Sequence, residues 1–349
     1  MTRERRRWKV TDTLMPRTSI RVGLILMLVA VTFTASFTAQ KKDKDKGNAA
    51  GLPEAIWRDP GNMASLNLLY GAGGKAHAPH TNGVFTFVRE DLEATSPKFD
   101  IQDDQGIRWR VKLGQEPESE TAATRFLWAA GYFVDEDYYL ATLTVRNMPT
   151  LHRGANFVLA DGTVRRARLE RRLKDVEREG AWDWFDNPFV DGRELNGLRV
   201  MMSLLNNWDL SEANNSIIER GGERRYLVAD LGATFGNTGN SLTRSKSVPE
   251  DYAESTFVEK TTPGFVDFVL HSRPFFLSAV NVPNYRDRTR MEQVTKHIPR
   301  ADAKWLGRRL SRLSGEQVRD AFRAGGYTTE EVELYTRSMR KRIAELSAL

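Results

Sequence analysis

The sequence contains no cysteine. This absence excludes a disulfide scaffold, catalysis by a thiol and a zinc site held by cysteine. Histidine is also scarce, and the histidines do not have the spacing of metal ligands, so we assign them no role. The five are His77, His80, His152, His271 and His297.

An excess of positive charge is missing from most of the chain, although the whole chain carries +6. Eleven Lys and Arg against four Asp and Glu give residues 1–46 a net charge of +7, which leaves −1 for the rest. A nearly neutral body has no electrostatic footprint for a phosphate backbone. We therefore exclude nucleic acid as a partner.

The first long apolar run spans residues 22–37 and follows a basic flank. This layout is typical of a signal peptide or signal anchor, which we place at residues 1–40. The basic side stays in the cytoplasm, so the sequence predicts a periplasmic or otherwise extracytoplasmic body that meets the membrane only through this segment. The small residues after the run do not form a clean cleavage site, so removal of the leader and anchoring in the inner membrane both remain open. Residues 41–82 are expected to be a linker and an N-terminal extension.

The GxxxxGK[ST] spacing of a phosphate-binding loop is also absent, and the glycine cluster at residues 71–75 is expected to be a flexible loop. Strand-forming residues follow at 84–88, 98–101 and 107–113. The next segment, with Pro117 in its first turn, predicts a helix that ends at Gly131.

Lys112 and Glu120 are the first pair of candidate functional residues. Glu120 lies on the apolar stripe of the predicted helix, and a buried carboxylate needs a cation. Lys112, at the end of the preceding strand, is the nearest one. Glu120 could instead complement the positive end of the helix dipole, as Glu116 and Glu118 could.

A loop with Ser96 and Lys98 joins the first two predicted strands. Such a turn can present backbone N–H groups and the lysine ammonium to phosphates. It could equally be a simple connection.

The second half of the chain places acids and amides in a fixed order. A helix is predicted at 195–205, and Asp209 and Asn214 follow it with four residues between them. Two strands, at 216–219 and 225–229, form a hairpin, and Asp230 comes directly after it.

This order suits phosphoryl transfer. That reaction needs a carboxylate to orient the attacking hydroxyl and a divalent metal to neutralise phosphate charge. Asp230 and the amide of Asn214 supply the hard oxygen ligands that Mg²⁺ prefers. Taken singly, Asp209 and Asn214 could be loop caps, and residues 230–232 a plain turn.

These segments resemble the atypical branch of the protein-kinase-like superfamily, which includes HipA-type kinases and type II phosphatidylinositol 4-kinases. Residues 207–214 are similar to the HipA-type catalytic segment N-x-D-x4-N, and residues 230–232 resemble its metal-binding DFG-like element. Residues 96–98 resemble the loop before the second strand. Residues 120–123 resemble the helix that carries the ion-pair glutamate, and residues 111–112 its partner strand.

The resemblance implies a role for each candidate. Lys112 would hold the α- and β-phosphates of ATP, and Glu120 would hold Lys112. Asp209 would be the catalytic base, and Asn214 and Asp230 would bind Mg²⁺. Ser96 and Lys98 would add contacts to the nucleotide.

The resemblance also implies an α+β, bilobal fold in an exported bacterial protein. A small antiparallel sheet with one main helix would form an N-lobe at residues 83–150, and a mostly helical C-lobe would span 151–349. The implied activity is transfer of a phosphoryl group from ATP, with Mg²⁺, to a hydroxyl on an unknown protein or small molecule. AMPylation would use the same residues. The alternative is an inactive pseudokinase that acts as an interaction or structural module in the periplasm, where ATP is scarce.

Four further expectations concern the remaining segments. Residues 161–179, rich in Arg and Glu, predict a surface helix or hairpin extension, and the aromatic residues 180–192 predict a loop packed between lobes or over the site. Residues 234–250 lie where a substrate loop would fall. Residues 301–349 predict helices that begin after Ser314 and Thr328.

Overall fold

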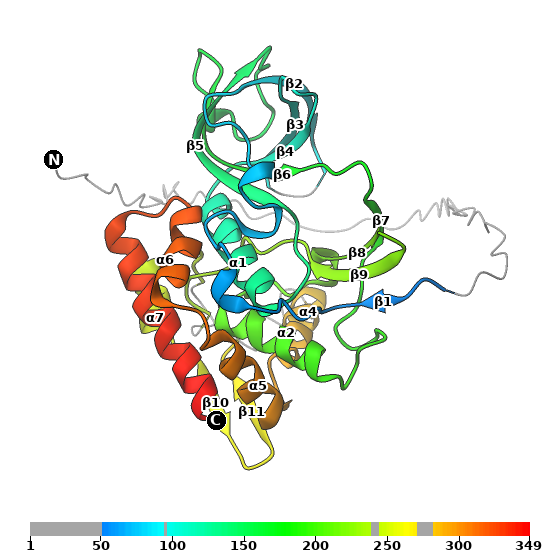
Figure 1. Ribbon diagram of the computed structural model, residues 1–349, viewed down its shortest axis with the longest axis vertical. Coiled ribbons are helices and arrows are strands. Elements are labelled where there is room, and N and C mark those ends of the chain that lie inside the picture. The colour runs from blue at the N-terminus through cyan, green and yellow to red at the C-terminus, as the bar shows by residue number, and fades with distance from the viewer. Residues whose placement is uncertain (1–50, 94–95, 239–243, 271–281) are drawn as a thin grey trace, which may run out of the picture. The chain divides into compact units, whose positions relative to one another are not determined.

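The computed structural model describes residues 51–93, 96–238, 244–270 and 282–349. The expected leader at residues 1–40 and part of the expected substrate loop therefore lie outside the described residues. Within the described ranges, no helix is long and apolar enough to cross a membrane. Sheets and helices occupy different parts of residues 51–349, which fits the expected α+β class (Figure 1).

The first sheet closes into a barrel with the strand order β2-β3-β4-β6-β5. Its strands are β2 (Val84–Asp91), β3 (Lys98–Gln102), β4 (Arg108–Lys112), β5 (Asp137–Arg146) and β6 (Thr163–Arg171). The pairs β2–β3, β3–β4, β4–β6 and β5–β6 are antiparallel, and a parallel pairing between β2 and β5 closes the barrel. The expectation of a purely antiparallel sheet is wrong at this closing pair.

Strand β6 lies beyond residue 150, where the sequence suggested that the first lobe ends. The strand pairs with both β4 and β5, and Val164, Ala167 and Leu169 contribute to the barrel core. The segment 161–179 is therefore mainly a core strand and not a surface extension. Its buried charged residues, Arg168 and Glu170, lie on the other face of the strand, where they pair with each other and Arg168 also pairs with Glu120 of α1.

Helix α1 (Glu116–Ala130) lies between the barrel strands β4 and β5 in the sequence. It packs against both the barrel and the core formed by the later part of the chain. It begins with Pro117 and ends at Gly131, whose φ of 102° is in the left-handed region that glycine adopts without strain. Its apolar side, with Ala123, Phe126 and Leu127, packs in a different core from that of the barrel strands. Its polar side faces β5 and β6.

The region after the barrel begins with α2 (Arg193–Leu204) and a hairpin. Strands β8 (Asn215–Arg220) and β9 (Glu223–Val228) form that hairpin as the sequence predicts, with the turn at Gly221 and Gly222. The hairpin is extended on its two sides by β7 (Glu177–Gly180) and by β1 (Glu54–Ala55). The aromatic segment 180–192 packs against this sheet: Trp182 and Trp184 are buried in the same core as Tyr226.

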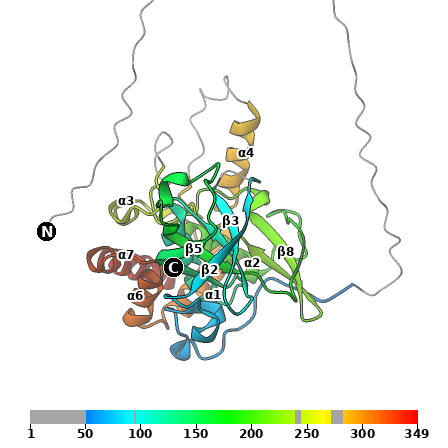
Figure 2. The same ribbon diagram turned by 90° about the horizontal axis from the view of Figure 1, so that it is seen from above.

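Helices complete the second core. In both views of the ribbon α6 (Gly315–Ala324) and α7 (Thr329–Ala348) lie side by side (Figures 1 and 2), and both start with the capping boxes that the sequence indicates. The other helices are α3 (Pro249–Glu254), α4 (Val282–Gln293) and α5 (Arg300–Leu310). A small sheet of β10 (Val258–Thr261), β11 (Phe265–Phe268) and β12 (Ile298–Pro299) lies between α3 and α5 in the sequence.

Short 3₁₀ helices mark the connecting segments. Three of them, η1 (Met63–Ser65), η2 (Gly71–Gly73) and η3 (Lys75–His77), lie in the N-terminal extension. The others are η4 (Ala155–Phe157) and η5 (Glu212–Asn214). The expected flexible loop at 71–75 is thus an ordered segment, and its η2 contacts α1.

Candidate active site

Lys112 is the centre of a cluster of charges between the barrel and α1. It is the last residue of β4, and only 2% of its side chain is exposed. Its Nζ lies 2.7 Å from Glu116 Oε2, 2.9 Å from Glu120 Oε2 and 3.0 Å from Asp230 Oδ1. The structure thus brings together the lysine, the helix glutamate and the aspartate that the sequence singled out.

The three carboxylates keep Lys112 charged. Burial by itself favours the neutral amine, but the neighbouring Glu120, Asp230 and Glu116 raise the pKa of the ammonium above its ordinary value. Burying an ammonium group costs free energy, and the three carboxylate partners offset that cost.

Glu120 is shared between two cations. Its second oxygen, Oε1, lies 3.1 Å from Nη1 of Arg168 on β6. Complete burial raises the pKa of Glu120 to about 7, although Arg168 and Lys112 act in the opposite direction. The two cations thus offset part of the cost of burying this carboxylate.

Asp230 approaches from the segment that follows β9. Burial raises its pKa, but the charge of Lys112 and the backbone N–H of Gly232 outweigh burial and lower the pKa to about 2. Lys112 and the Gly232 N–H both donate to Oδ1. Asp230 is therefore ionised at neutral pH, with Oδ2 as the oxygen that a further cation would contact.

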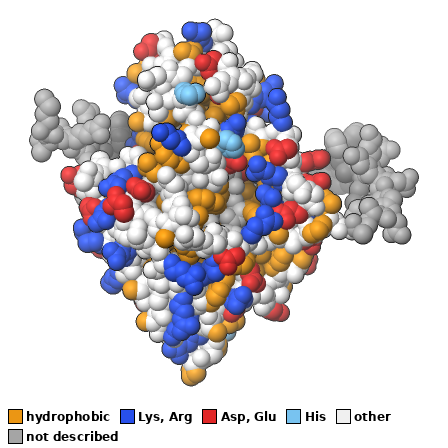
Figure 3. Space-filling model, in the orientation of Figure 1, with side chains coloured by type: hydrophobic (Ala, Val, Ile, Leu, Met, Phe, Trp, Pro, Cys, Tyr) orange, Lys and Arg blue, Asp and Glu red, His pale blue; other side chains and the backbone are white. Residues whose placement is uncertain are grey.

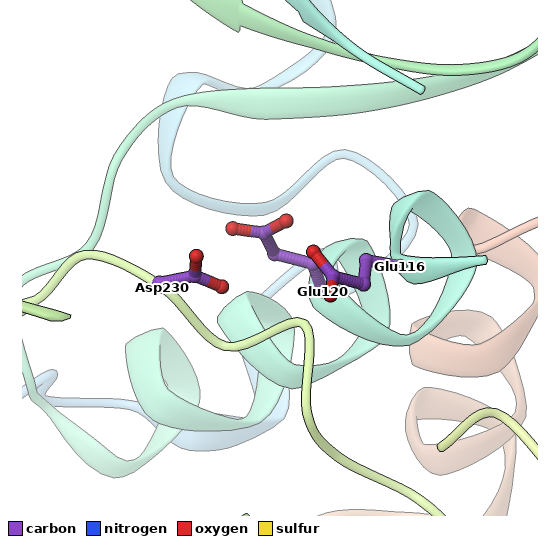
Figure 4. Close-up of side chains that lie close together, drawn as sticks. All are labelled: Glu116, Glu120 and Asp230. Carbon is purple, nitrogen blue, oxygen red and sulfur yellow. The ribbon is translucent and has the colours of Figure 1, made fainter. Parts of the chain in front are cut away.

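Glu116 is a member of the cluster that the sequence left as a helix-dipole residue. Besides Lys112, it accepts a hydrogen bond of 3.0 Å from the Ser96 hydroxyl and pairs with the Lys246 ammonium. The i,i+4 spacing between Lys112 and Glu116 is the one feature of the sequence that could have indicated this pair. The other partners of Glu116, Ser96 and Lys246, lie in distant segments of the chain. Figure 4 shows Glu116 and Glu120 on neighbouring turns of α1, with Asp230 opposite. One ligand oxygen of each of these three residues lies within 4.8 Å of the others.

Lys112, Glu120 and Asp230 of the cluster line a cleft of about 310 Å³. Lys98 lines it, directly opposite Lys112 in the β3–β4 pairing, and so does Asn214. Ten of the lining residues are charged, and the two small apolar ones are Ala213 and Ala229. The remaining lining residues are Arg110, Lys112, Glu120, Asp135, Arg168, Glu170, Arg172, Arg178 and Asp230.

Asp209 is hydrogen-bonded to Asn214, which is one of the residues that line this cleft. Its backbone carbonyl accepts a hydrogen bond of 2.9 Å from the Asn214 amide nitrogen, and its own N–H donates to Asn207 Oδ1. Among the described residues that line the cleft, Asp209 itself does not occur. The bond to Asn214 leaves the amide oxygen of Asn214 as the atom that can serve as a ligand.

A network of arginines and acids also lines the cleft, and the sequence did not indicate it. Glu170 on β6 pairs with Arg168, Arg172 and Arg178 at 2.9, 2.7 and 3.1 Å. Burial raises the pKa of Glu170, but these guanidinium groups outweigh it and lower the pKa to about 2. Arg178 also binds Asp135 at 2.8 Å and donates to the Ser216 hydroxyl, so it ties the barrel to the β8–β9 hairpin.

No protein-family model and no curated protein matches the sequence. Among solved structures, the chain is similar to the Helicobacter pylori proinflammatory kinase CtkA, with 12% identity, a TM-score of 0.40, and coverage of 75% of this chain and 93% of that one. It is also similar to the Golgi casein kinase with Mn and ADP bound, with 8% identity, a TM-score of 0.41, and coverage of 78% and 72%. Likenesses at this level do not assign the chain to a family, so the functional argument rests on the site.

Proposed function

We propose that this protein is a kinase-like phosphotransferase that uses ATP and Mg²⁺ to modify a hydroxyl on a protein or small molecule. One observation carries the proposal: Lys112, Glu120, Asp230 and Asn214 line one cleft although they come from four different segments of the chain. Their residue types are those that phosphoryl transfer requires.

Lys112 and Lys98 are the residues that would hold the phosphates. Both line the cleft from adjacent strands, and the N-terminal end of α1 lies beside them. Glu120 positions Lys112 from one side, while Ser96 is held near the site by its bond to Glu116. A phosphate that enters would replace part of the carboxylate contacts that Lys112 makes without it.

The donor set fits a divalent metal. Asp230 is ionised, its Oδ2 takes no part in the bonds to Lys112 and Gly232, and the Asn214 amide oxygen lies in the same cleft. Carboxylate and amide oxygens are the ligands that Mg²⁺ accepts. When bound, the metal would neutralise phosphate charge, and Asp209, adjacent to Asn214, would accept the proton of the attacking hydroxyl.

A second candidate function is a nucleotide-free interaction module. The observation that favours it is the charged lining: Arg168, Glu170 and Arg178 line the cleft and pair with one another, and no aromatic or large aliphatic residue is among the described residues that line it. The location that we propose, outside the cytoplasm, adds to this candidate because ATP is scarce there.

Thermal unfolding with and without ATP and Mg²⁺ separates the two functions. Binding to the folded state raises Tm according to RT ln(1 + [L]/Kd). If the protein is a phosphotransferase, ATP and Mg²⁺ together should raise the Tm of the native chain, and they should not raise the Tm of Asp230→Ala. Asp186→Ala is the control, because Asp186 is exposed and is not among the described residues that line the cleft. An unchanged Tm for the native chain at millimolar ATP, with Mg²⁺ and then Mn²⁺, would establish the second function in place of the first.

A further inference from the structure

A second and larger pocket is lined by residues other than those of the cluster around Lys112. Its volume is about 620 Å³. Residues of the N-terminal extension form one wall, and α1, β5 and α6 supply the others. In Figure 1 the extension is the blue segment that crosses α1, and the same face in Figure 3 shows Lys and Arg, His and hydrophobic side chains next to one another.

The lining of this pocket combines aromatic surface with positive charge. Tyr70, Tyr138 and Tyr139 supply aromatic rings, and no Asp or Glu is among the described residues that line it. The cations are Lys75, Arg125 and Arg323. Arg323 is paired with acids on its own helix, whereas Lys75 makes no ion pair within the described part of the chain.

Arg125 is the buried cation of the pocket, with only 2% of the residue exposed. Its Nη1 lies 2.8 Å from Asp137 Oδ1, and its Nη2 donates to the Asp137 carbonyl. Its Nε is buried without a hydrogen-bond partner among the described residues. Gly71 packs against this side chain so closely that a Cβ at residue 71 would lie 2.6 Å from Nη1. The extension therefore holds Arg125 in place and leaves one donor unused, which is unfavourable unless a ligand or water accepts from it.

A series of buried ion pairs, each 3.9 Å or closer, links Arg125 to Lys112. Asp137 Oδ2 lies 3.9 Å from Arg168 Nη1, Arg168 pairs with Glu120 at 3.1 Å, and Glu120 pairs with Lys112 at 2.9 Å. Asp137 Oδ2 and Arg168 Nε are also buried without hydrogen-bond partners among the described residues. Incompletely satisfied ion pairs of this kind can redistribute when one member gains a new partner.

We propose that this pocket binds a small organic anion with an aromatic or apolar body, and that binding there changes the contacts of Lys112. The acidic group of the ligand contacts Lys75 and Arg125, and its body lies against Tyr70 and Tyr138. An acceptor for Arg125 weakens the pull of Arg125 on Asp137. Asp137 then attracts Arg168 more strongly, and the ion pair between Arg168 and Glu120 weakens. Glu120 in turn interacts more strongly with Lys112. Only the effect on nucleotide rests on the proposed function; the pocket and its ligand do not.

The binding test uses 1-anilinonaphthalene-8-sulfonate, which is an aromatic anion, and N-phenyl-1-naphthylamine, which has the same rings without the sulfonate. We expect the fluorescence titration of the native protein, without nucleotide, to give a Kd for the anion about tenfold lower than for the neutral compound. Lys75→Glu weakens the anion about tenfold and leaves the neutral compound unchanged, because it reverses one charge that contacts the sulfonate. Lys260→Glu, an equal charge change at an exposed site on β10, alters neither Kd. Equal affinity for the two compounds would contradict the proposal that this pocket binds an organic anion. An anion Kd that Lys75→Glu leaves unaltered would contradict it as well.

The coupling test measures the Kd of ATP with Mg²⁺ in the presence and absence of saturating anion. Coupled sites change each other's affinity by the same factor, which we expect to be about fivefold or more. Hydrogen exchange in α1 provides a second readout that needs no nucleotide, and we expect the anion to change it around Glu120. If ATP does not bind at all, the proposed function fails while the pocket stands on its own titration. If the anion binds but alters neither α1 exchange nor ATP affinity, the coupling is wrong.

Discussion

The carboxylate of Glu116 occupies the space that a side chain at Gly232 would need. A Cβ at residue 232 would lie 2.7 Å from Glu116 Cδ and 2.8 Å from Glu116 Cβ. The glycine after Asp230 therefore has a packing reason: it allows the segment after β9 to approach α1 closely enough for Asp230 and Glu116 to share Lys112.

Gly232→Ala is expected to destabilise the fold by about 1–3 kcal/mol, the usual cost of inserting a methyl group into a packed site. Urea denaturation measures the change. The double variant Gly232→Ala with Glu116→Gly tests its origin, because removing Glu116 Cβ together with the carboxylate relieves the clash and makes the two effects non-additive. A Gly232→Ala variant as stable as the native protein would contradict this packing.

Lys112→Met is expected to be strongly destabilising, by about 3–5 kcal/mol, because it leaves buried carboxylates without their cation. The measurement is again urea denaturation near neutral pH. Lys260→Met is the matched control, since this exposed lysine should change stability by no more than about 0.5 kcal/mol. Similar losses in the two variants would mean that the ammonium does not hold the cluster together.

Stability should fall at acid pH through Asp230. Its pKa is about 2 in the folded state against an ordinary 3.8, because Lys112 and the Gly232 N–H outweigh burial. The folded state therefore holds fewer protons than the unfolded chain, and this contribution is present above pH 3.8 and is lost as the pH falls toward 2. Comparing the pH dependence of unfolding for native protein and Asp230→Asn isolates the contribution, and parallel curves would refute it.

Glu120 should act in the opposite direction. Burial raises its pKa to about 7 from an ordinary 4.5, so its contribution is fully present below pH 4.5 and is lost as the pH rises toward 7. Glu120→Gln removes this dependence, and its unfolding free energy should change less than that of the native protein between these two values. A native profile that rises with pH in this window, and loses the rise in the variant, would reverse the sign of the effect.

Asp209→Asn separates binding from chemistry within the proposed function. Because Asp209 adjoins the cleft through Asn214 but does not line it, nucleotide binding should be retained. Phosphoryl transfer should fall by about 10²–10⁴-fold, the usual contribution of a general base. The measurements are the Tm shift with ATP and Mg²⁺ and the transfer of the terminal phosphate, with Asp186→Asn as control. Loss of the Tm shift together with activity would give Asp209 a binding role instead.

The sequence predicted those features that depend on neighbours in the chain. Strand alternation and the helix stripe placed Lys112 opposite Glu120, and the order of helix, loop and hairpin located Asn214 and Asp230 in one unit. The pairing of Glu116 was missed because Ser96, Gly232 and Lys246 are far from it in the sequence. Strand β6 was missed because its many Arg and Glu residues resemble a solvated surface, whereas the structure pairs Arg168 with Glu170 and Glu120 on the face of the strand that lines the cleft.

By itself, the sequence determined those strands and helices whose short-range periodicity and capping residues are clear, such as α1, the β8–β9 hairpin, α6 and α7. It also indicated that Glu120, on the apolar stripe of its helix, needed a cation, and that Lys112 was the nearest one. Only the tertiary structure decided which partners they found. Barrel closure, the approach of residue 232 to α1 and the position of the extension over Arg125 are contacts between distant segments, and local patterns carry no information about which distant segments meet.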